Sequence, residues 1–227
     1  MEHIILASGS PRREEYFRLL GLPFSCRPAD VDESFDPDGE PQAVAEELAL
    51  RKIKKVLETL PDEAPPPSSF SSDEQLSGAR RVTFTSTTPS PVRAHHLAWI
   101  CGADTLISLE GKIYGKPADR DDARRMLFSF QGKTHEVISA VALYNGRAQT
   151  VDCRSVVSTV TFAPLTPGEI EWYLDSGEWQ DAAGAYKIQG LASCLISAIN
   201  GSYSSIVGLP LREFYAMLRD NGYPYGG

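Results

Sequence analysis

The sequence predicts an α/β protein in which a mixed sheet is flanked by helices. Short apolar runs typical of buried strands alternate along the chain with segments of helical periodicity. The dipeptide Asn145-Gly146 lies between two apolar runs and indicates a hairpin with a two-residue loop, so part of the sheet is expected to be antiparallel. The 227 residues suffice for one large core or for two lobes that share a cleft.

A strand, a turn and a helix are expected at residues 4–21. The apolar run from Ile4 to Leu6 predicts a buried strand, and Ser10 and Pro11 suit the N-cap and the first position of a helix. Arg12 and Arg13 then fall in the first helical turn, where cations oppose the positive end of the helix dipole. Backbone N–H groups and two guanidinium groups together suit a phosphate. Arginines that are only solvated are an equally weighted alternative.

An acidic loop follows a short strand expected around Phe24 to Cys26. Asp30, Asp32 and Glu33 lie close together in this loop. Composition alone favours an exposed acidic turn. The alternative is a site for a hard cation, because closely spaced carboxylates can hold Mg²⁺ against phosphate oxygens.

The next helix is expected over residues 43–60, where apolar residues recur with helical spacing. Lys52 falls on its apolar stripe rather than on the opposite face. Its ammonium group either snorkels at the border of the stripe or points into a cleft, and both interpretations stay open at this point.

A low-complexity segment runs from about Pro61 to His96. It is rich in Pro, Ser and Thr and poor in large aliphatic residues, which predicts a flexible surface insertion in a single domain that spans residues 1–227. A short strand is expected at Arg81 to Ser86, and the adjacent His95 and His96 are interpreted as incidental. Of an inert loop, a lid and a partner-binding segment, the inert loop is favoured.

The second half of the chain resumes the alternation of strands and helices. A strand at residues 97–101 leads to Asp104 and Thr105. A carboxylate at the end of an apolar strand is often catalytic or metal-binding in α/β folds, although an ordinary turn residue is the alternative. Further helices are expected at residues 121–130, 167–177 and 211–222, and further strands at 106–109, 136–144, 151–162 and 195–199, whereas residues 178–190 fit no regular element.

Composition and charge exclude several classes of partner. The net charge of −8 argues against a nucleic-acid polymer or an anionic membrane surface as the main partner. No signal peptide, membrane span or paired-cysteine motif is recognisable, which predicts a cytoplasmic protein with reduced core thiols. Any anion site is therefore a local basic pocket, which suits a compact phosphorylated small molecule.

The remaining candidates for chemistry are cations and carboxylates. The sequence contains no GxxxxGK[ST] loop, no HExxH and no GxSxG elbow, and His135 is interpreted as structural rather than catalytic. Cations neutralise a polyphosphate, and carboxylates hold its metal or activate water. The candidate set indicates a nucleotide or polyphosphate enzyme, although spacing alone does not show that the groups converge: Arg12, Arg13, Lys52, Lys116, Asp32, Glu33 and Asp104.

Taken in order, the motifs resemble the Maf family of nucleoside triphosphate pyrophosphatases, once described as septum formation inhibitors. The matching segments are LASGSPRREEYFRLLG, DVDE, LALRK, GADT, GKP, FQGKTHEV, AGAYKIQG and IVGLPL. They cover nearly the whole chain except about Leu57 to His96. The resemblance implies a two-lobed α/β fold with a central cleft, similar to inosine triphosphate pyrophosphatases. It also implies hydrolysis of a nucleoside triphosphate to the monophosphate and pyrophosphate with a divalent cation, Mg²⁺ or Mn²⁺.

The resemblance assigns roles to residues motif by motif. Asp104 matches the proposed general base, and Glu33 matches the acidic residue near the metal, which Asp104 also contacts. Arg12, Thr105 and Gln189 match the branch that acts on dTTP and UTP rather than the branch that acts on 7-methyl-GTP, and we hypothesise that Gln189 reads the O4 and N3–H edge of a pyrimidine. The residues that match phosphate-binding positions are Ser8, Ser10, Arg13, Lys52 and Lys116.

Two departures from the family pattern affect the expected cleft. Ala182 stands where a lysine commonly precedes AGAY, so one phosphate-facing cation is missing. Ser139 and Ala140 stand where Thr-Gly is usual, which is expected to narrow the approach of the backbone to a ligand.

The leading hypothesis is a dTTP and UTP pyrophosphatase, a hydrolase of phosphoanhydride bonds. The rival hypothesis is a nucleotide-binding regulator of cell division with little turnover. Family members are often dimeric, so a homodimer is also expected, although no exposed apolar face in the sequence demonstrates one.

Overall fold

The computed structural model describes residues 1–36, 39–60, 70–76, 79–84 and 99–225, and within these residues nine strands form one mixed sheet. The strands are β1 (Ile4–Leu6), β2 (Phe24–Cys26), β3 (Phe70–Leu76), β4 (Ala79–Phe84), β5 (Trp99–Leu109), β6 (Lys112–Tyr114), β7 (Thr134–Asn145), β8 (Thr150–Phe162) and β9 (Ile196–Asn200). The strand order is β2-β1-β5-β7-β8-β4-β3, with β6 paired to β5 and β9 paired to β8. Only the pairs that β1 makes with β2 and with β5 are parallel among these strands. The predicted mixed sheet is therefore confirmed.

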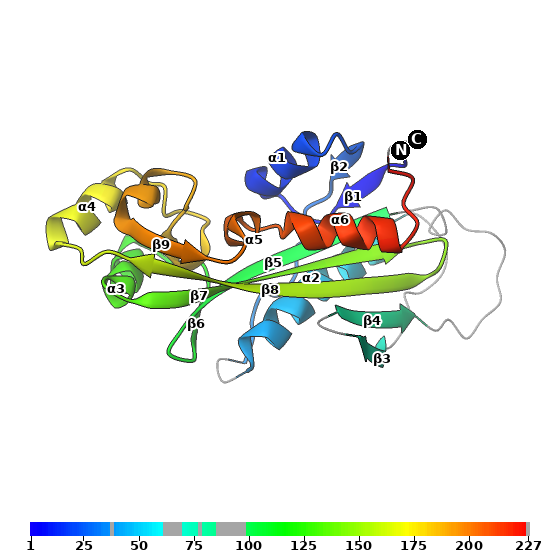
Figure 1. Cartoon of the computed structure of the whole chain (residues 1–227), viewed down its shortest axis with the longest axis horizontal. Coiled ribbons are helices and arrows are strands. Elements are labelled where there is room, and N and C mark those ends of the chain that lie inside the picture. The colour runs from blue at the N-terminus through cyan, green and yellow to red at the C-terminus, as the bar shows by residue number, and fades with distance from the viewer. Residues whose placement is uncertain (37–38, 61–69, 77–78, 85–98, 226–227) are drawn as a thin grey trace.

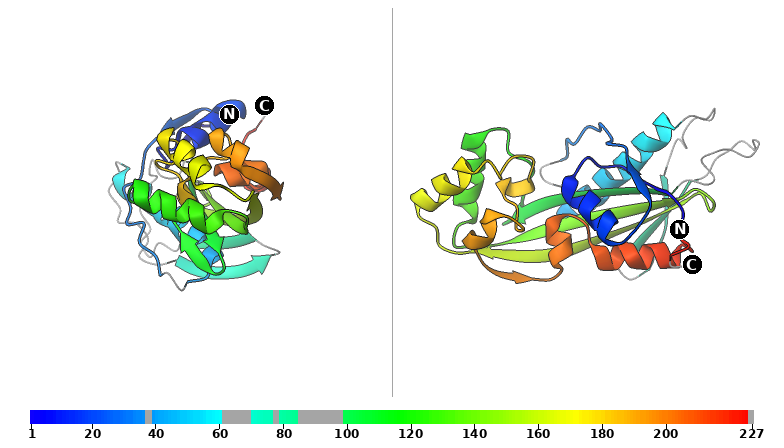
Figure 2. Two further views of the ribbon diagram at one scale, coloured as in Figure 1. Left: turned by 90° about the vertical axis from the view of Figure 1, so that its left-hand side faces the viewer. Right: turned by 90° about the horizontal axis from the view of Figure 1, so that it is seen from above.

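Helices lie on both faces of this sheet. They are α1 (Pro11–Leu19), α2 (Pro41–Thr59), α3 (Arg120–Phe130), α4 (Pro167–Asp175), α5 (Tyr203–Val207) and α6 (Leu211–Asp220), with 3₁₀ turns η2 (Ala183–Ala185) and η3 (Leu191–Leu195). In Figures 1 and 2, α2 covers one face while α1 and α6 lie together on the other. None of the helices in the described ranges combines the length and apolar character that crossing a membrane requires.

Alternation of side chains along β5 explains this arrangement. Ile100 belongs to the core beneath α2, whereas Trp99 and Cys101 belong to the core beneath α1 and α6. Successive strand residues point to opposite faces, so a continuous apolar run covers both sides of the sheet. The central strand is therefore buried on both faces.

The long strands β5, β7 and β8 continue beyond these helices into a second lobe, where α3, α4 and β9 gather (Figure 1). A third core fills this lobe and includes Ile107 from β5, Val137 from β7 and Phe162 from β8. Two lobes thus share one sheet, and a cleft of about 1040 Å³ lies between them.

Several boundaries differ from the sequence-based expectations. β5 runs without interruption through Gly102, so Asp104 lies inside a strand rather than at its end. It nevertheless lies beyond the carboxyl end of the neighbouring strand, because β1 ends at Leu6, which pairs with Cys101.

The hairpin at Asn145 has a four-residue connection, so the prediction of a two-residue loop was wrong. Asn145 pairs with Thr150, and residues 146–149 form the turn. The side-chain Oδ1 of Asn145 accepts hydrogen bonds from the backbone N–H groups of Arg147 and Ala148 at 3.0 and 3.2 Å. This side-chain cap stabilises a wider turn than the Asn-Gly pair predicts.

The short helix α5 was not anticipated from the sequence, because five residues give too little periodicity to recognise. Within the low-complexity segment, β3 and β4 form an antiparallel hairpin that extends the sheet beside β8. The short strand expected at residues 81–86 corresponds to β4, whereas His95 and His96 lie outside the described residues.

Candidate active site

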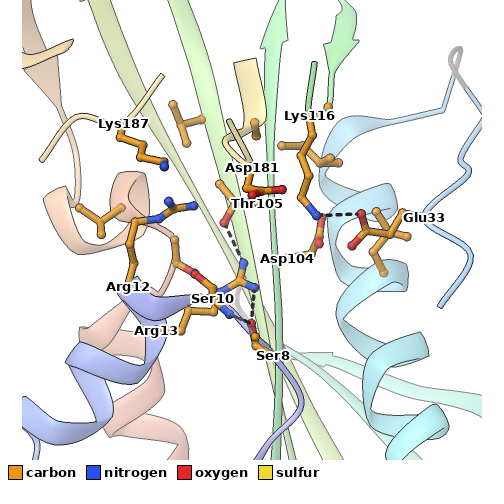
Figure 3. Close-up of a pocket in the computed structure, with 18 of the residues that line it drawn as sticks. Ser8, Ser10, Arg12, Arg13, Glu33, Asp104, Thr105, Lys116, Asp181 and Lys187 are labelled. Carbon is orange, nitrogen blue, oxygen red and sulfur yellow. Dashed lines mark hydrogen bonds and ion pairs between the residues drawn. The ribbon is translucent and has the colours of Figure 1, made fainter. Parts of the chain in front are cut away.

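The candidate site is the cleft between the two lobes, shown in Figure 3. Its walls come from the start of α1, from α2, from β5 and from the segments around residues 181–189 and 206–208. All ten site residues assigned from the sequence line it: Ser8, Ser10, Arg12, Arg13, Glu33, Lys52, Asp104, Thr105, Lys116 and Gln189. The fold thus brings together groups that lie up to 181 positions apart, from Ser8 to Gln189.

Arg13 is buried at the bottom of the cleft. Its Nε donates to the carbonyl oxygen of Gly208 at 2.9 Å, and its Nη1 donates to the hydroxyl of Ser8 at 3.1 Å. Gly208 has φ of +126°, a backbone conformation that other residues rarely adopt, so its carbonyl is presented to Arg13 by a turn that requires glycine. Burial lowers the pKa of Arg13, and the charge of Asp104 opposes that shift. The interpretation of Arg13 as a solvated arginine is therefore wrong.

Ser10 occupies the N-cap of α1 as expected, but its side chain makes no capping hydrogen bond. Its backbone N–H donates instead to the hydroxyl of Ser8 at 3.2 Å. The Ser8 hydroxyl thereby joins the turn before α1 to the guanidinium group of Arg13.

Thr105 is held between Arg13 and the neighbouring strand. Its Oγ1 lies 3.4 Å from Nη2 of Arg13 and 2.8 Å from the hydroxyl of Ser139 on β7. Ser139 is fully buried and donates in turn to the carbonyl oxygen of Ser205 at 2.7 Å. Ser139 therefore orients Thr105, and the narrowed approach expected from Ser139 and Ala140 stays a prediction.

Four charged groups converge on the opposite wall. Nζ of Lys52 lies 2.5 Å from Oδ1 of Asp104 and 3.2 Å from Oε1 of Glu33. Nζ of Lys116 lies 3.2 Å from Oε2 of Glu33. Lys52 is buried on the apolar stripe of α2, and of its two interpretations the cleft-facing one is confirmed.

Glu33 is the only carboxylate of the acidic loop that reaches the cleft within the described residues. Burial opposes its ionisation, but the ammonium groups of Lys52 and Lys116 outweigh this and lower the pKa of Glu33. Asp32 serves the loop instead, since its Oδ1 accepts a hydrogen bond from the backbone N–H of Ser34 at 2.9 Å.

Sequence reasoning did not assign a role to three further polar residues that line the cleft. They are Asp181, Tyr186 and Lys187, from the segment that includes η2. The segment was quoted as a family motif, but its lack of helical or strand periodicity gave no orientation for its side chains. The one available signal was that two charged residues, Asp181 and Lys187, flank a run of small residues in this segment.

His135 is structural, as expected. It is buried, and its Nε2 lies 2.8 Å from the hydroxyl of Tyr186. Burial lowers the pKa of His135 to about 4, so the ring is neutral at physiological pH. The four cysteines form no disulfide, and Cys101 and Cys153 are buried whereas Cys26 and Cys194 are exposed.

The donor set of the cleft fits a divalent cation that arrives with a phosphorylated ligand. In the described part of the chain, no group of three or more His, Cys, Asp or Glu side chains is arranged to hold a metal by itself. Mg²⁺ in nucleotide enzymes commonly uses one or two carboxylates together with substrate phosphates. Glu33 and Asp104 supply such a pair, because both approach the same ammonium group, that of Lys52.

A cleft in which five cations face three carboxylates suits an anionic, phosphorylated ligand. The family model described as "Maf-like protein" matches residues 3–221. The chain therefore belongs to the Maf-like protein family.

Relatives of known description cover the chain almost completely. A dTTP/UTP pyrophosphatase of Symbiobacterium thermophilum is 38% identical over 224 residues, which cover 99% of this chain and 96% of the relative. A dTTP/UTP pyrophosphatase of Aromatoleum aromaticum is 39% identical over 231 residues, covering 97% and 96%. A solved structure of a nucleoside-triphosphatase, or dITP/XTP pyrophosphatase, from Mycobacterium abscessus covers 96% of this chain and 97% of its own, at 12% identity and a TM-score of 0.39. At that TM-score the likeness supports no conclusion about the site.

Proposed function

We propose that this protein is a nucleoside triphosphate pyrophosphatase that hydrolyses dTTP and UTP to the monophosphate and pyrophosphate. The relatives described as dTTP/UTP pyrophosphatases support the substrate. The observation that carries the proposal is the convergence of the buried pair of Asp104 and Lys52 with Arg13 in one cleft. A neutral ligand would leave these charged groups without compensation, whereas a triphosphate is complementary to the cations.

In this reaction Asp104 accepts a proton from the attacking water, whose oxygen forms a bond to phosphorus as the bond between the α- and β-phosphates breaks. Lys52 orients the Asp104 carboxylate through the 2.5 Å contact. Arg13 and Lys116 stabilise the negative charge that develops on the phosphate oxygens and on the leaving pyrophosphate. Because Arg13 is already fixed by Gly208 and Ser8, it needs no rearrangement to do so.

A divalent cation, Mg²⁺ or Mn²⁺, is part of the proposal. Glu33 and Asp104 are the residues that would hold it, and it would neutralise phosphate charge when bound. The proposal places the enzyme in the cytoplasm, where nucleoside triphosphates are used. The homodimer stays a prediction.

Pyrophosphate release from a panel of nucleoside triphosphates, with Mg²⁺ or Mn²⁺, tests this function. We expect release from dTTP and UTP, and a loss of about 100-fold or more for Asp104→Asn, since general bases contribute on that order. Asp104→Asn keeps the shape of the side chain and removes its charge and basicity. Absence of Asp104-dependent release from every nucleotide would favour the regulator instead. Release mainly from 7-methyl-GTP would overturn the assignment to dTTP and UTP.

A further inference from the structure

Five cations and three carboxylates line the cleft, and they differ in whether protein groups already bind them. Lys52 and Lys116 are paired with Asp104 and Glu33. Arg13 is enclosed by hydroxyl and carbonyl oxygens. These cations already have oxygen partners before any ligand binds.

Arg12 and Lys187 are different. Toward the described residues, neither side chain donates a hydrogen bond or forms an ion pair, although both are half-buried and line the cleft. In Figure 3 the two side chains point toward one another from α1 and from the segment after η2. An anion that lies between two such cations can accept charge-assisted hydrogen bonds from both.

Asp181 is the carboxylate of the cleft whose charge acts most strongly on Arg12, but it is not bound to either cation among the described contacts. Asp181 lines the same part of the cleft, and its charge opposes the effect of burial, which lowers the pKa of Arg12. It forms no salt bridge with Arg12 or Lys187 among the described contacts, and it is itself exposed.

The backbone that carries Lys187 is well anchored. Its N–H donates to the hydroxyl of Tyr173 at 3.2 Å, and its carbonyl accepts from the backbone N–H of Gly190 at 3.0 Å. The preceding residue, Tyr186, is buried in the core of the second lobe. Lys187 therefore projects from a fixed position across the cleft toward the other lobe.

We propose that Lys187 and Arg12 together form a second anion subsite that binds the leaving pyrophosphate of the substrate. The proposal rests on the proposed function for the identity of the substrate. A pyrimidine base is neutral at physiological pH and cannot neutralise two cations, whereas the two end phosphates of a triphosphate can. Lys187 is thus a substrate-binding residue. It provides a cation in the segment where Ala182 stands in place of the lysine that is common in the family.

Binding of inorganic pyrophosphate in Mg²⁺ buffer, measured by isothermal titration calorimetry, tests the subsite without turnover. We expect Lys187→Ala to weaken binding about 10-fold or more, because a charge-assisted hydrogen bond is lost. Lys187→Arg keeps the charge and is expected to retain binding to within about threefold. The matched control is Lys55→Ala, an exposed lysine of α2 that does not line the cleft, which should bind as the unaltered protein does.

A double-mutant cycle tests whether the two cations bind the same anion. The effects of Arg12→Ala and Lys187→Ala should not add, since residues that contact one group are energetically coupled. Unchanged pyrophosphate affinity in Lys187→Ala, with an unchanged melting temperature, would overturn the subsite. The subsite would also be overturned if Lys187→Ala changed only the discrimination between UTP and CTP, because that result would place the nucleotide base beside Lys187. Because pyrophosphate binding needs no hydrolysis, loss of the proposed activity and loss of the subsite are separate results.

Discussion

The ammonium group of Lys52 lies among carboxylates although its side chain leaves α2 on the apolar stripe. Removing such charges from water costs several kcal/mol per ion, and an ion pair recovers this only with good geometry. The short contact to Asp104 and the second contact to Glu33 provide that geometry. A buried pair of this kind adds little net stability, so its place in the cleft is better explained by chemistry than by folding.

Gln189 is the residue on which base selection is expected to depend. Its amide both donates and accepts hydrogen bonds, which suits the O4 and N3–H edge of uracil or thymine. We predict that Gln189→Ala raises KM for UTP selectively, by about 10-fold for a lost substrate hydrogen bond. Steady-state kinetics with UTP and CTP check this, and unchanged discrimination against CTP would contradict the assignment.

His135 makes a pH dependence of stability predictable. Burial lowers its pKa to about 4, so the native ring stays neutral while the unfolded chain takes up a proton below its ordinary pKa of about 6.5. The unfolded state binds more protons in this window, and stability therefore falls as pH falls through it, by up to about 3 kcal/mol.

Urea denaturation at about pH 7 and about pH 5 measures this loss. His135→Phe removes the titrating group from an aromatic cluster that contains Phe130 and Phe162. The variant should lose less stability between the two pH values, whatever its absolute stability. Equal losses in both proteins would show that His135 does not titrate as described.

At the scale of elements, the distance between α2 and β5 determines whether Lys52 reaches Asp104. Gly102 allows the close approach, because a Cβ at this position would lie 2.5 Å from the carbonyl oxygen of Ala49 and 3.0 Å from Ile53. The obstructing atom is helix backbone, so the whole helix has to move rather than one side chain.

We therefore predict that Gly102→Ala lowers the free energy of unfolding by about 1–3 kcal/mol, as overpacking does. It should also lower kcat, because displacing α2 lengthens the contact between Lys52 and Asp104. Gly168→Ala is the matched control, since its Cβ would meet only the hydroxyl of Thr166 at 4.0 Å in the first turn of α4. Chemical denaturation measures the free energy of unfolding, and pyrophosphate release measures kcat. Unchanged values of both in Gly102→Ala would show that α2 does not need this close approach to β5.

At the scale of the whole molecule, the cleft joins two lobes that share the long strands β5, β7 and β8. A ligand that contacts both walls stabilises the folded protein by mass action, by about 2.7 kcal/mol at 100 times its Kd. For a chain of this size we predict a rise in Tm of about 5–10 °C with a UTP analogue that resists hydrolysis between the α- and β-phosphates. Thermal unfolding measures it, with uridine at the same concentration as the control, and an equal shift with uridine would show that the phosphates contribute nothing.

The sequence by itself determined the alternation of strands and helices, the family and the residues expected in the cleft. Caps and periodicity are local signals, which is why α2 and the start of α1 could be predicted closely. Even so, they missed the longer turn, which the Asn145 side chain caps, and the helix α5, whose five residues give too little periodicity to recognise.

Only the tertiary structure decided which charged groups have partners. Sequence spacing left Lys52 and Arg13 between solvent and cleft, since neither side chain's surroundings depend on nearby residues alone. The partners come from β5 and from Gly208, far along the chain. For the same reason the role of Lys187 could be inferred only from the fold. There it faces Arg12 across the cleft, and among the described residues no carboxylate is bound to either side chain.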